Sequence, residues 1–307
     1  MRSLLRSASA CTALLVALAP LAAASQLKLG GQTNLSLAYG QPLAFTLAAA
    51  PNKPALVFYD ASPGPISIAG ELVPLGLTPV LTLVGGGSTG ASGVLSGFAF
   101  LPEDPALAGA SIYFAGVALD AADPNGLDFS NGAVLSITPP AGAGADQSAF
   151  VASQVVLDGS AAFGSASQPP LGMSFQWQLV GKPAGSNAGL AQANSPFAVL
   201  TPDVPGDYRA RLTVALNGAQ ASGETLVHAY RLAFAPEVEA IYNPTILLTA
   251  AGNLYGPAGA TLSIEGQPVP LSGTAFGPLF PWLDATQVVQ QIDCEVVHPD
   301  GSKARQV

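Results

Sequence analysis

Residues 208–216 read Tyr208-Arg-Ala-Arg-Leu-Thr-Val-Ala-Leu216, so that apolar and polar side chains alternate. One face carries Tyr208, Ala210, Leu212, Val214 and Leu216, and the other carries Asp207, Arg209, Arg211 and Thr213. A period of two residues is typical of a half-buried antiparallel strand. A second segment, Ser174-Phe-Gln-Trp-Gln-Leu179, places Phe175, Trp177 and Leu179 on one side. Two such faces predict the core of a β-sandwich.

The segments on either side are also rich in short β-type runs. Before residue 139 they include Ala55-Leu-Val-Phe-Tyr59, Pro79-Val-Leu-Thr-Leu-Val84 and Ser111-Ile-Tyr-Phe-Ala-Gly-Val-Ala-Leu119. The chain of 307 residues contains 34 Gly and 27 Pro without a collagen-like period, so these residues punctuate many short elements. Pro139-Pro-Ala-Gly-Ala-Gly-Ala145 reads as a linker with nothing to bury. The sequence therefore predicts an all-β fold of tandem sandwiches.

Five separated motifs in the middle of the chain occur in a characteristic order. They are Val155-Val-Leu-Asp-Gly-Ser160, Phe175-Gln-Trp177, Lys182-Pro-Ala-Gly-Ser186, Thr201-Pro-Asp-Val-Pro-Gly-Asp-Tyr208 and Arg211-Leu-Thr-Val214. Together they resemble a PKD-type domain, in the variant with a Lys-Pro-Ala-Gly-Ser loop after the third strand. The resemblance spans residues 145–233 and implies an immunoglobulin-like sandwich, usually an extracellular spacer or interaction module.

These motifs also have a physical interpretation. Asp158-Gly159 suits a tight turn after a strand, and Gly206 permits a positive φ. Tyr208 stands where a tyrosine corner holds the loop that enters a strand, and Trp177 takes the place of the buried core tryptophan. All five residues are predicted to be structural, so they identify a fold and not a site.

The other regions carry weaker resemblances. Ala260-Thr-Leu-Ser-Ile-Glu-Gly-Gln-Pro-Val-Pro-Leu271, Phe276 and Asp300-Gly301 resemble bacterial immunoglobulin-like repeats with an exposed hairpin. Ile66-Ser-Ile-Ala-Gly-Glu-Leu-Val-Pro-Leu75 echoes that hairpin, through a shared turn type or by coincidence. The first region resembles a β-rich module of secreted bacterial proteins on the segments Leu101–Gly109, Tyr113, Leu119-Asp120 and Gly126–Gly132; that module implies no activity.

The start of the chain predicts export. Arg2 and Arg6 precede an apolar stretch, Ala13–Leu21, and the small residues Ala22-Ala-Ala24, which is the pattern of a signal peptide cleaved after Ala24. The expected domains are thus 1–24 (signal peptide), 25–138, a linker at 139–145, 146–233, and 234–307, the last being cut short if the chain is the front of a longer protein. No later stretch has 18 uninterrupted apolar residues, so no transmembrane segment is predicted.

The charge and cysteine content exclude some partners. Without Arg2 and Arg6, 8 basic residues oppose 19 acidic ones, which lowers the formal charge from −9 to −11. Nucleic acid is excluded because binding it needs clustered Lys and Arg. Cys11 precedes the apolar stretch, which argues against a lipoprotein. Loss of the leader leaves Cys294 alone, expected to be a buried, inert thiol or, alternatively, to pair between molecules.

One glycine-rich segment matches two catalytic motifs. Gly86-Gly-Ser88-Thr-Gly90 fits the G-x-S-x-G of hydrolases, and Gly85, Gly87 and Gly90 fit a dinucleotide fingerprint. Both motifs need a helix after the turn, and the residues that follow show no helical period. A glycine-rich hairpin tip is expected instead.

A second cluster offers oxygen ligands for Ca²⁺. Asp120, Asp123, Asn125 and Asp128 lie within nine residues, as hard cations prefer, but without the EF-hand order or flanking helices. The alternative interpretation is a solvated turn built on Pro124-Asn125-Gly126. Ca²⁺ is the single cofactor that the sequence suggests.

Histidine and carboxylate chemistry is not predicted. His228 and His298 are 70 residues apart in different predicted domains, and with one cysteine they cannot complete a zinc tetrad. His228, between apolar neighbours on a strand, is expected to be a partly buried structural residue. Glu237 and Glu239 have the spacing of a glycosidase carboxylate pair on a strand, but no cleft surrounds them in the sequence, and a solvated strand face is expected instead.

These observations favour a non-enzymatic role. We expect a secreted or cell-surface adhesion, spacer or scaffold protein whose partners are proteins or polysaccharides at the cell surface. The alternative is a carbohydrate-binding accessory region of a larger secreted hydrolase, with Trp282, Tyr255 and Tyr242 as the aromatic platform. An esterase using Ser88 is a third, more distant hypothesis.

Overall fold

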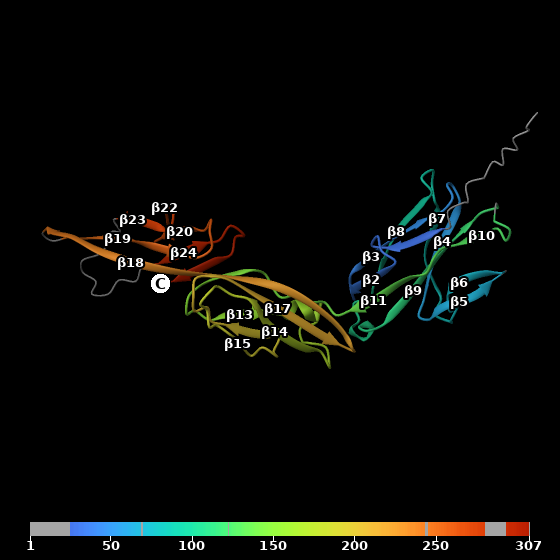
Figure 1. Cartoon of the computed structure of the whole chain (residues 1–307), viewed down its shortest axis with the longest axis horizontal. Coiled ribbons are helices and arrows are strands. Elements are labelled where there is room, and N and C mark those ends of the chain that lie inside the picture. Colours follow the sequence, from blue (N-terminus) through green and yellow to red (C-terminus); the bar gives the residue numbers. More distant parts are fainter. Residues whose placement is uncertain (1–24, 69, 122, 243–244, 280–292, 307) are drawn as a thin grey trace, which may run out of the picture. The chain divides into compact units, whose positions relative to one another are not determined.

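A computed structural model gives the fold (Figure 1). It describes residues 25–68, 70–121, 123–242, 245–279 and 293–306, with the backbone alone for 235–242, 245–250 and 278–279. The chain forms two compact units. One comprises 25–33, 44–98 and 113–134, and the other comprises 34–43, 99–112 and 135–306. No helix in the described ranges is long and apolar enough to cross a membrane.

The first eleven strands occupy residues 25–138. They are β1 (Gln26–Leu29), β2 (Asn34–Ala38), β3 (Pro42–Ala48), β4 (Pro54–Asp60), β5 (Pro63–Ile68), β6 (Glu71–Leu75), β7 (Thr82–Ser88), β8 (Val94–Phe100), β9 (Ser111–Leu119), β10 (Leu127–Phe129) and β11 (Ala133–Thr138), with a short 3-10 helix η1 (Pro105–Leu107). Their sheets have the orders β1-β3-β8 and β2-β11-β9-β4-β7, with β10 on β9, and β5 pairs β6 in a separate hairpin. The predicted strands at 55–59 and 111–119 are confirmed.

The glycine-rich segment is not a hairpin tip, and that expectation is wrong. β7 and β8 belong to different sheets, so residues 89–93 connect two sheets. The connection bonds to the loop between β3 and β4: Thr89 N–H donates to the Lys53 carbonyl at 3.0 Å, and Thr89 Oγ1 to the Ala50 carbonyl at 2.6 Å. The residue pattern of a strand does not show whether the next strand in sequence joins the same sheet. The sequence therefore predicted a hairpin where the chain passes from one sheet to another.

The central sandwich has the predicted immunoglobulin-like form. Its strands are β12 (Gln147–Phe150), β13 (Val155–Asp158), β14 (Ser174–Gly181), β15 (Leu190–Ala191), β16 (Phe197–Leu200), β17 (Gly206–Leu216) and the first part of β18 (Ala219–Tyr242), with a 3-10 helix η2 (Ser160–Phe163). We call these elements, residues 147–233, the PKD-like sandwich. One sheet runs β14-β17-β18 with β12 on β18, and the facing sheet runs β13-β16-β15.

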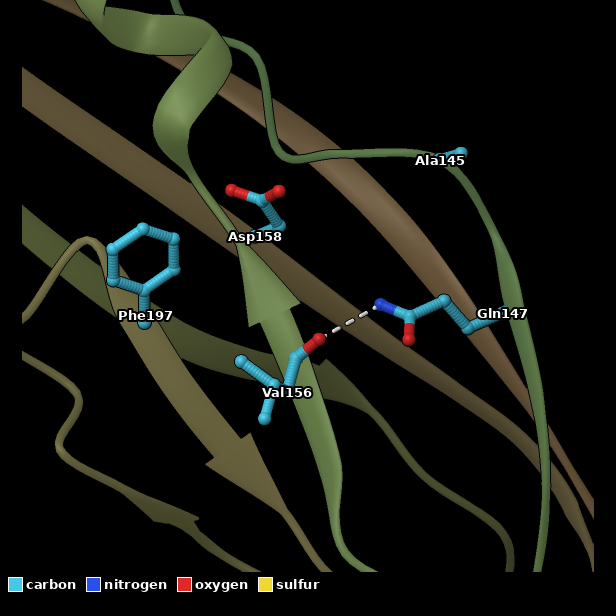
Figure 2. Close-up of a pocket in the computed structure, with 5 residues that line it drawn as sticks. All are labelled: Ala145, Gln147, Val156, Asp158 and Phe197. Carbon is cyan, nitrogen blue, oxygen red and sulfur yellow. Dashed lines mark hydrogen bonds between the residues drawn. The ribbon is translucent and has the colours of Figure 1, made fainter. Parts of the chain in front are cut away.

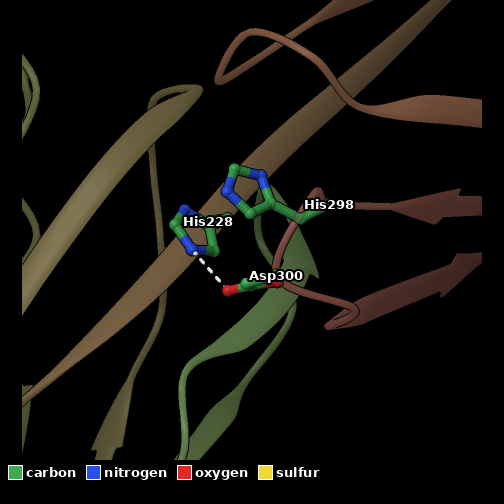
Figure 3. A group of neighbouring side chains, drawn as sticks. All are labelled: His228, His298 and Asp300. Atoms are coloured by element: carbon green, nitrogen blue, oxygen red, sulfur yellow. Dashed lines mark hydrogen bonds and ion pairs between the residues drawn. The ribbon is translucent and has the colours of Figure 1, made fainter.

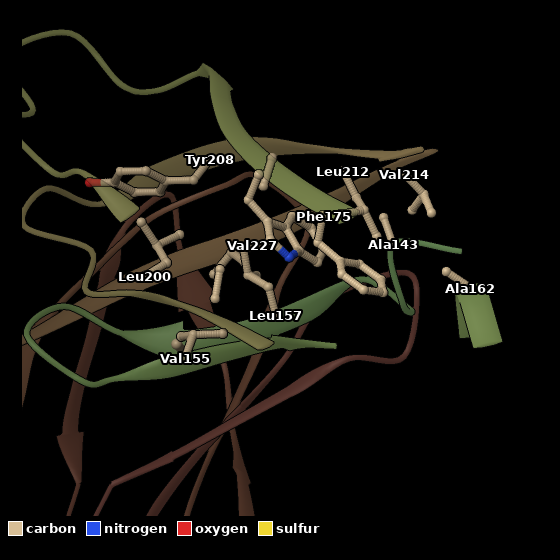
Figure 4. Packing of buried hydrophobic residues seen from close by; sticks show 14 of the residues in the cluster. Ala143, Val155, Leu157, Ala162, Phe175, Leu200, Tyr208, Leu212, Val214 and Val227 are labelled. Atoms are coloured by element: carbon tan, nitrogen blue, oxygen red, sulfur yellow. The ribbon is translucent and has the colours of Figure 1, made fainter. Parts of the chain in front are cut away.

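The core of the PKD-like sandwich confirms the alternation predicted for residues 208–216. Tyr208, Ala210, Leu212, Val214 and Leu216 are all buried, as are Phe175 and Trp177 on β14. Figure 4 labels Tyr208, Leu212, Val214 and Phe175 among them. Arg209 and Arg211 are exposed on the other face. The indole N–H of Trp177 has no partner among the described residues, so this side chain contributes by packing alone.

The predicted tyrosine corner is present. The Tyr208 hydroxyl lies 2.8 Å from the Val204 carbonyl and 2.9 Å from Asp203 Oδ1, and it accepts from the Val204 and Asp203 N–H groups at 3.0 and 3.2 Å. Asp203 also accepts from the Ser186 hydroxyl at 2.5 Å and from Asn187 N–H at 2.6 Å. The corner therefore ties the Lys-Pro-Ala-Gly-Ser loop to the loop that enters β17.

Two glycines are required, for different reasons. Gly206 has a φ of +135°, which confirms the predicted positive φ. Gly159 precedes η2 with a negative φ, but a Cβ there would lie 2.8 Å from the Pro196 carbonyl oxygen and 2.9 Å from Leu212 Cδ2. Close approach of neighbouring atoms thus excludes a side chain at Gly159.

The segment 139–145 is irregular, but the expectation that it buries nothing is wrong. Ala143 is buried in the core of the PKD-like sandwich. A Cβ on Gly142 would lie 2.3 Å from Ala161 Cβ, so the chain packs tightly there. Small residues permit this close approach. Gly and Ala residues are also typical of flexible linkers, which is why the sequence predicted a linker here.

The C-terminal part forms a second pair of sheets, which we call the C-terminal sandwich. Its elements are the remainder of β18, β19 (Thr245–Tyr255), β20 (Thr261–Ile264), β21 (Gln267–Val269), β22 (Leu271–Ser272), β23 (Ala275–Leu279), β24 (Cys294–Val297) and β25 (Lys303–Gln306). One sheet runs β18-β19-β23-β22 and the other β21-β20-β24-β25. The predicted hairpin is β20–β21, and β5–β6 has the same two-residue connection.

The core of the C-terminal sandwich contains Cys294 and Phe276, both buried. Burial, with the nearby carboxylates of Asp293 and Glu265, raises the pKa of the Cys294 thiol to about 11. The burial expected of Cys294 is confirmed, and the inertness of its thiol stays a prediction that the raised pKa supports.

Candidate functional site: a histidine cluster between two sandwiches

A cluster of titratable side chains lies where the PKD-like and C-terminal sandwiches meet within the second unit. His228 and Tyr230 are on β18, Asp207 is at the start of β17, and His298 and Asp300 are in the turn between β24 and β25 (Figure 3). Asp207 is the register partner of His228. We call His228, His298, Asp300, Asp207 and Tyr230 the histidine cluster.

The two imidazole rings of the cluster are stacked. Their centroids are 3.6 Å apart and their planes differ by 13°. His228 Nδ1 lies 2.7 Å from Asp207 Oδ1, and His228 Nε2 lies 3.1 Å from Asp300 Oδ2. His228 is buried, His298 is half-buried and Asp300 is exposed, so the cluster opens toward solvent on the side of the β24–β25 turn.

The contacts of His228 carry an electrostatic consequence. A neutral imidazole has one N–H, yet both ring nitrogens face a carboxylate oxygen. One of the two contacts therefore brings a lone pair against a negative charge unless a cation is present. That cation is either a second proton on the ring or a metal ion.

Further hydrogen bonds hold the remaining members. Tyr230 Oη and His298 Nδ1 are 2.7 Å apart. Asp300 Oδ1 accepts from the Ser302 N–H at 2.8 Å and from its hydroxyl at 2.7 Å, and Ser302 Oγ lies 2.7 Å from Ser148 Oγ on β12. Asp300 is thus oriented by Ser302, outside the cluster, and His298 contacts Tyr230 within it.

Two pKa values shift within the cluster. Burial, followed by the charges of Asp207 and Asp300, raises the pKa of the Tyr230 phenol, which keeps it protonated. Burial opposes ionisation of Asp300, but the Ser302 hydrogen bonds and both histidines outweigh it, so the pKa of this carboxyl is lowered. Asp300 is therefore a carboxylate at neutral pH.

The two histidines lie in different sandwiches, as expected, but their contact with each other was not predicted. The burial predicted for His228 is confirmed. His298, 70 residues further along the sequence, stacks on the His228 ring. Two of the five residues in this cluster have a sequence signal. Asn217-Gly218, both at positive φ, is a hairpin turn that sets Leu216 opposite Ala219. Counting outward from that turn pairs Asp207 with His228, whereas nothing local predicts His298 or Asp300.

The four residues proposed for calcium have separate partners. Asp120 pairs with Lys53 at 2.9 Å, and Asp123 Oδ1 accepts from Asn125 N–H at 2.9 Å. Asn125 Nδ2 donates to Glu71, and Asp128 Oδ2 accepts from the Ser25 hydroxyl at 2.5 Å. The turn is built as the alternative interpretation expects, and calcium binding stays a prediction.

The aromatic and carboxylate candidates are only partly visible. Trp282 lies outside the described residues, and the side chains of Tyr242, Glu237 and Glu239 do so as well. The ring of Tyr255 is covered on one face by Arg231, whose guanidinium carbon lies 4.9 Å from the ring centroid. Ser88 ends β7 and is followed by a turn and then β8, as predicted, so the helix of a nucleophile elbow does not form there.

A shallow hollow of about 430 Å³ lies at one edge of the PKD-like sandwich, between β12 and β13 (Figure 2). It is lined by Ala145, Gln147, Val156, Asp158 and Phe197. Gln147 Nε2 donates to the Val156 carbonyl at 3.0 Å across the edge, and the Phe197 ring is exposed. Asp158 accepts from Ser160 N–H at 2.8 Å, and hydrogen bonds from Ser160 lower the pKa of its carboxyl.

Comparison with known proteins finds similar solved structures, each with a low TM-score, and no match that names an activity. No protein-family model matches the chain, and no curated protein is similar to it. A solved PKD domain, from the protein KIAA 1837, is 28% identical over 30% of this chain and 86% of its own, with a TM-score of 0.25. Extracellular domains 3–5 of Drosophila OTK are 10% identical over 89% of this chain and 94% of theirs, with a TM-score of 0.26. Over the described residues the chain is an all-β array that includes immunoglobulin-like sandwiches.

Proposed function

We propose that the chain is a secreted or cell-surface, non-catalytic structural and adhesion module that contacts proteins or glycans. The observation that carries this proposal is β18, a strand of 24 residues that pairs with β17 in the PKD-like sandwich and with β19 in the C-terminal sandwich. Because one continuous strand is hydrogen-bonded into sheets of both sandwiches, the connection between them is regular strand rather than an irregular loop. Two sandwiches coupled in this way suit a rigid spacer.

The contact surface that we favour is the exposed face of β8, which carries Val94, Phe98 and Phe100. Six large apolar residues between positions 80 and 100 are exposed: Val80, Leu81, Leu83, Val94, Phe98 and Phe100. Phe98 and Phe100 are 70% and 82% exposed, which is costly unless a partner covers them. Exposed aromatic residues of this kind are typical of protein contact sites.

The test is a binding assay with the fluorescently labelled chain on intact cells of the organism that encodes it. We expect the double variant Phe98→Ser/Phe100→Ser to lose most cell binding while its circular dichroism spectrum is unchanged. Leu171→Ser is the matched control, because Leu171 is fully exposed elsewhere in the chain. Equal binding by all three proteins would reject this surface as the adhesive one.

A carbohydrate-binding accessory role is the second candidate, and the hollow beside Phe197 favours it. An exposed ring next to an amide and a carboxylate is the combination that sugar recognition uses, with stacking on one side and hydrogen bonds on the other. We expect Phe197→Ala to abolish retention on insoluble polysaccharides such as cellulose or chitin, and Leu171→Ala to leave it intact. Retention that is unchanged in Phe197→Ala would exclude this site.

A further inference from the structure

We propose that His228, His298 and Asp300 form a Zn²⁺ site that links the PKD-like sandwich to the C-terminal sandwich. One potential ligand atom from each residue lies within 4.8 Å of the other two. Zinc accepts imidazole nitrogen and carboxylate oxygen at about 2.0–2.2 Å, and three protein ligands plus a water complete its tetrahedron. The inference concerns metal binding and is independent of any adhesive role.

The residues around the proposed ligands are arranged as outer partners of a metal site. Ligating histidines ordinarily use their second ring nitrogen in a hydrogen bond to a carboxylate or another fixed group. Asp207 holds His228 Nδ1 in this way at 2.7 Å, and the Tyr230 hydroxyl holds His298 Nδ1 at 2.7 Å. Ser302 occupies Oδ1 of Asp300 and leaves Oδ2 directed at His228 Nε2.

The charge of the site requires a cation. With Asp207 taking the proton of Nδ1, Nε2 of His228 presents a lone pair to Asp300 Oδ2 at 3.1 Å. A zinc ion between these two atoms converts that repulsion into two coordinate bonds. The competing explanation is that His228 is protonated. A chelator removes a zinc ion but not a proton, so it distinguishes the two.

Binding requires one ring to turn. The imidazole planes are nearly parallel, so an ion in the plane of one ring lies outside the plane of the other. His298 is the ring suited to rotate, because it is half-buried in the β24–β25 turn, whereas His228 is enclosed on β18. A rotation about its side-chain torsions that keeps Nδ1 beside the Tyr230 hydroxyl brings the Nε2 lone pair of His298 toward the ion.

The donor set also selects the metal. Two imidazoles and one carboxylate suit Zn²⁺, whereas Ca²⁺ and Mg²⁺ require oxygen ligands. The calcium candidates Asp120, Asp123, Asn125 and Asp128 belong to a different part of the chain, which makes them useful controls.

The experiment is isothermal titration of the tag-free full chain with zinc chloride at neutral pH in a buffer that does not bind metal. We expect one zinc ion per chain, displaced by EDTA, and no heat from calcium or magnesium at this site. His298→Gln and Asp300→Asn should each weaken binding more than about 10-fold, and Asp207→Asn by about 10- to 100-fold. Asp123→Asn should leave it unchanged.

Cobalt provides a second readout that does not depend on the heat of binding. Co²⁺ in a site of two nitrogens and one carboxylate gives visible absorption bands, which should disappear in His298→Gln while the circular dichroism spectrum stays that of the parent. Absence of zinc binding by the parent chain, or zinc binding that His298→Gln and Asp300→Asn leave unchanged, would overturn the proposal.

Discussion

The tyrosine corner lies within the PKD-like sandwich and the histidine cluster joins that sandwich to the C-terminal one, and the two networks differ in how their donors and acceptors match. In the corner, the Asp203 carboxylate meets only donors: Ser186, Asn187 and Tyr208. In the cluster, His228 meets a carboxylate at each ring nitrogen. A balanced network stabilises a loop and needs nothing else, whereas an unbalanced one needs a proton or a metal ion.

The networks also differ in their reach along the chain. The corner spans residues 186–208, and the cluster joins residues 207–230 to residues 298–300. Side chains brought together from two sandwiches are the ones that a ligand can use to couple them. We therefore assign a structural role to the tyrosine corner and the candidate function to the histidine cluster.

The largest effect is expected from Tyr208→Phe. This side chain is completely buried, and loss of its hydroxyl leaves the Asp203 and Val204 N–H groups without their acceptor. We predict a loss of about 1–3 kcal/mol in the free energy of unfolding, measured by urea denaturation. Zinc affinity should not change, and a loss of both would mean that the two networks are not separate.

A smaller effect is expected from Tyr230→Phe, the matched change in the histidine cluster. Tyr230 is equally buried, but its partner His298 is half-buried and can turn to water. We predict a loss of about 0.5–1.5 kcal/mol without metal, together with weaker zinc binding. A larger loss of stability than in Tyr208→Phe would reverse the assignment of roles.

The third prediction concerns folding stability in acid, and its effect at neutral pH is the smallest of the three. The hydrogen bond from Ser186, with those from Asn187 and Tyr208, lowers the pKa of Asp203 from 3.8 to about 2. A lowered pKa stabilises the folded state above the unfolded value, and this contribution is lost as the pH falls from about 4 toward 2. In Ser186→Ala, that decline should be shallower when unfolding is measured across this range. A decline as steep as in the parent would show that Ser186 does not set the pKa.

The sequence predicted the PKD-like sandwich well because its signals are local. Residues 208–216 show the period of a strand without any tertiary information, and the motif around Asp203 and Tyr208 closes within a few residues. The sequence singles out Gly159 because Asp-Gly suits a tight turn. The structure gives a further reason, since atoms of Pro196 and Leu212 leave no room for a side chain there.

Other features depend on contacts that no local pattern encodes. The sequence of β7 and β8 predicts a hairpin, but the two strands belong to different sheets. The Gly/Ala run at 139–145 predicts a segment without core residues, but Ala143 is buried in the core. The position of His298 against His228 depends on how two sandwiches pack. Register from Asn217-Gly218 predicts the Asp207–His228 pair, and the rest of the site required the structure.

The most direct test of the central claim is an anomalous difference map at the zinc absorption edge, from crystals of the chain grown with zinc. We predict one peak about 2.0–2.2 Å from His228 Nε2, from Asp300 Oδ2 and from a nitrogen of a rotated His298, with no peak at the tyrosine corner. A map without density between these three side chains, with the rings still stacked, would contradict the account.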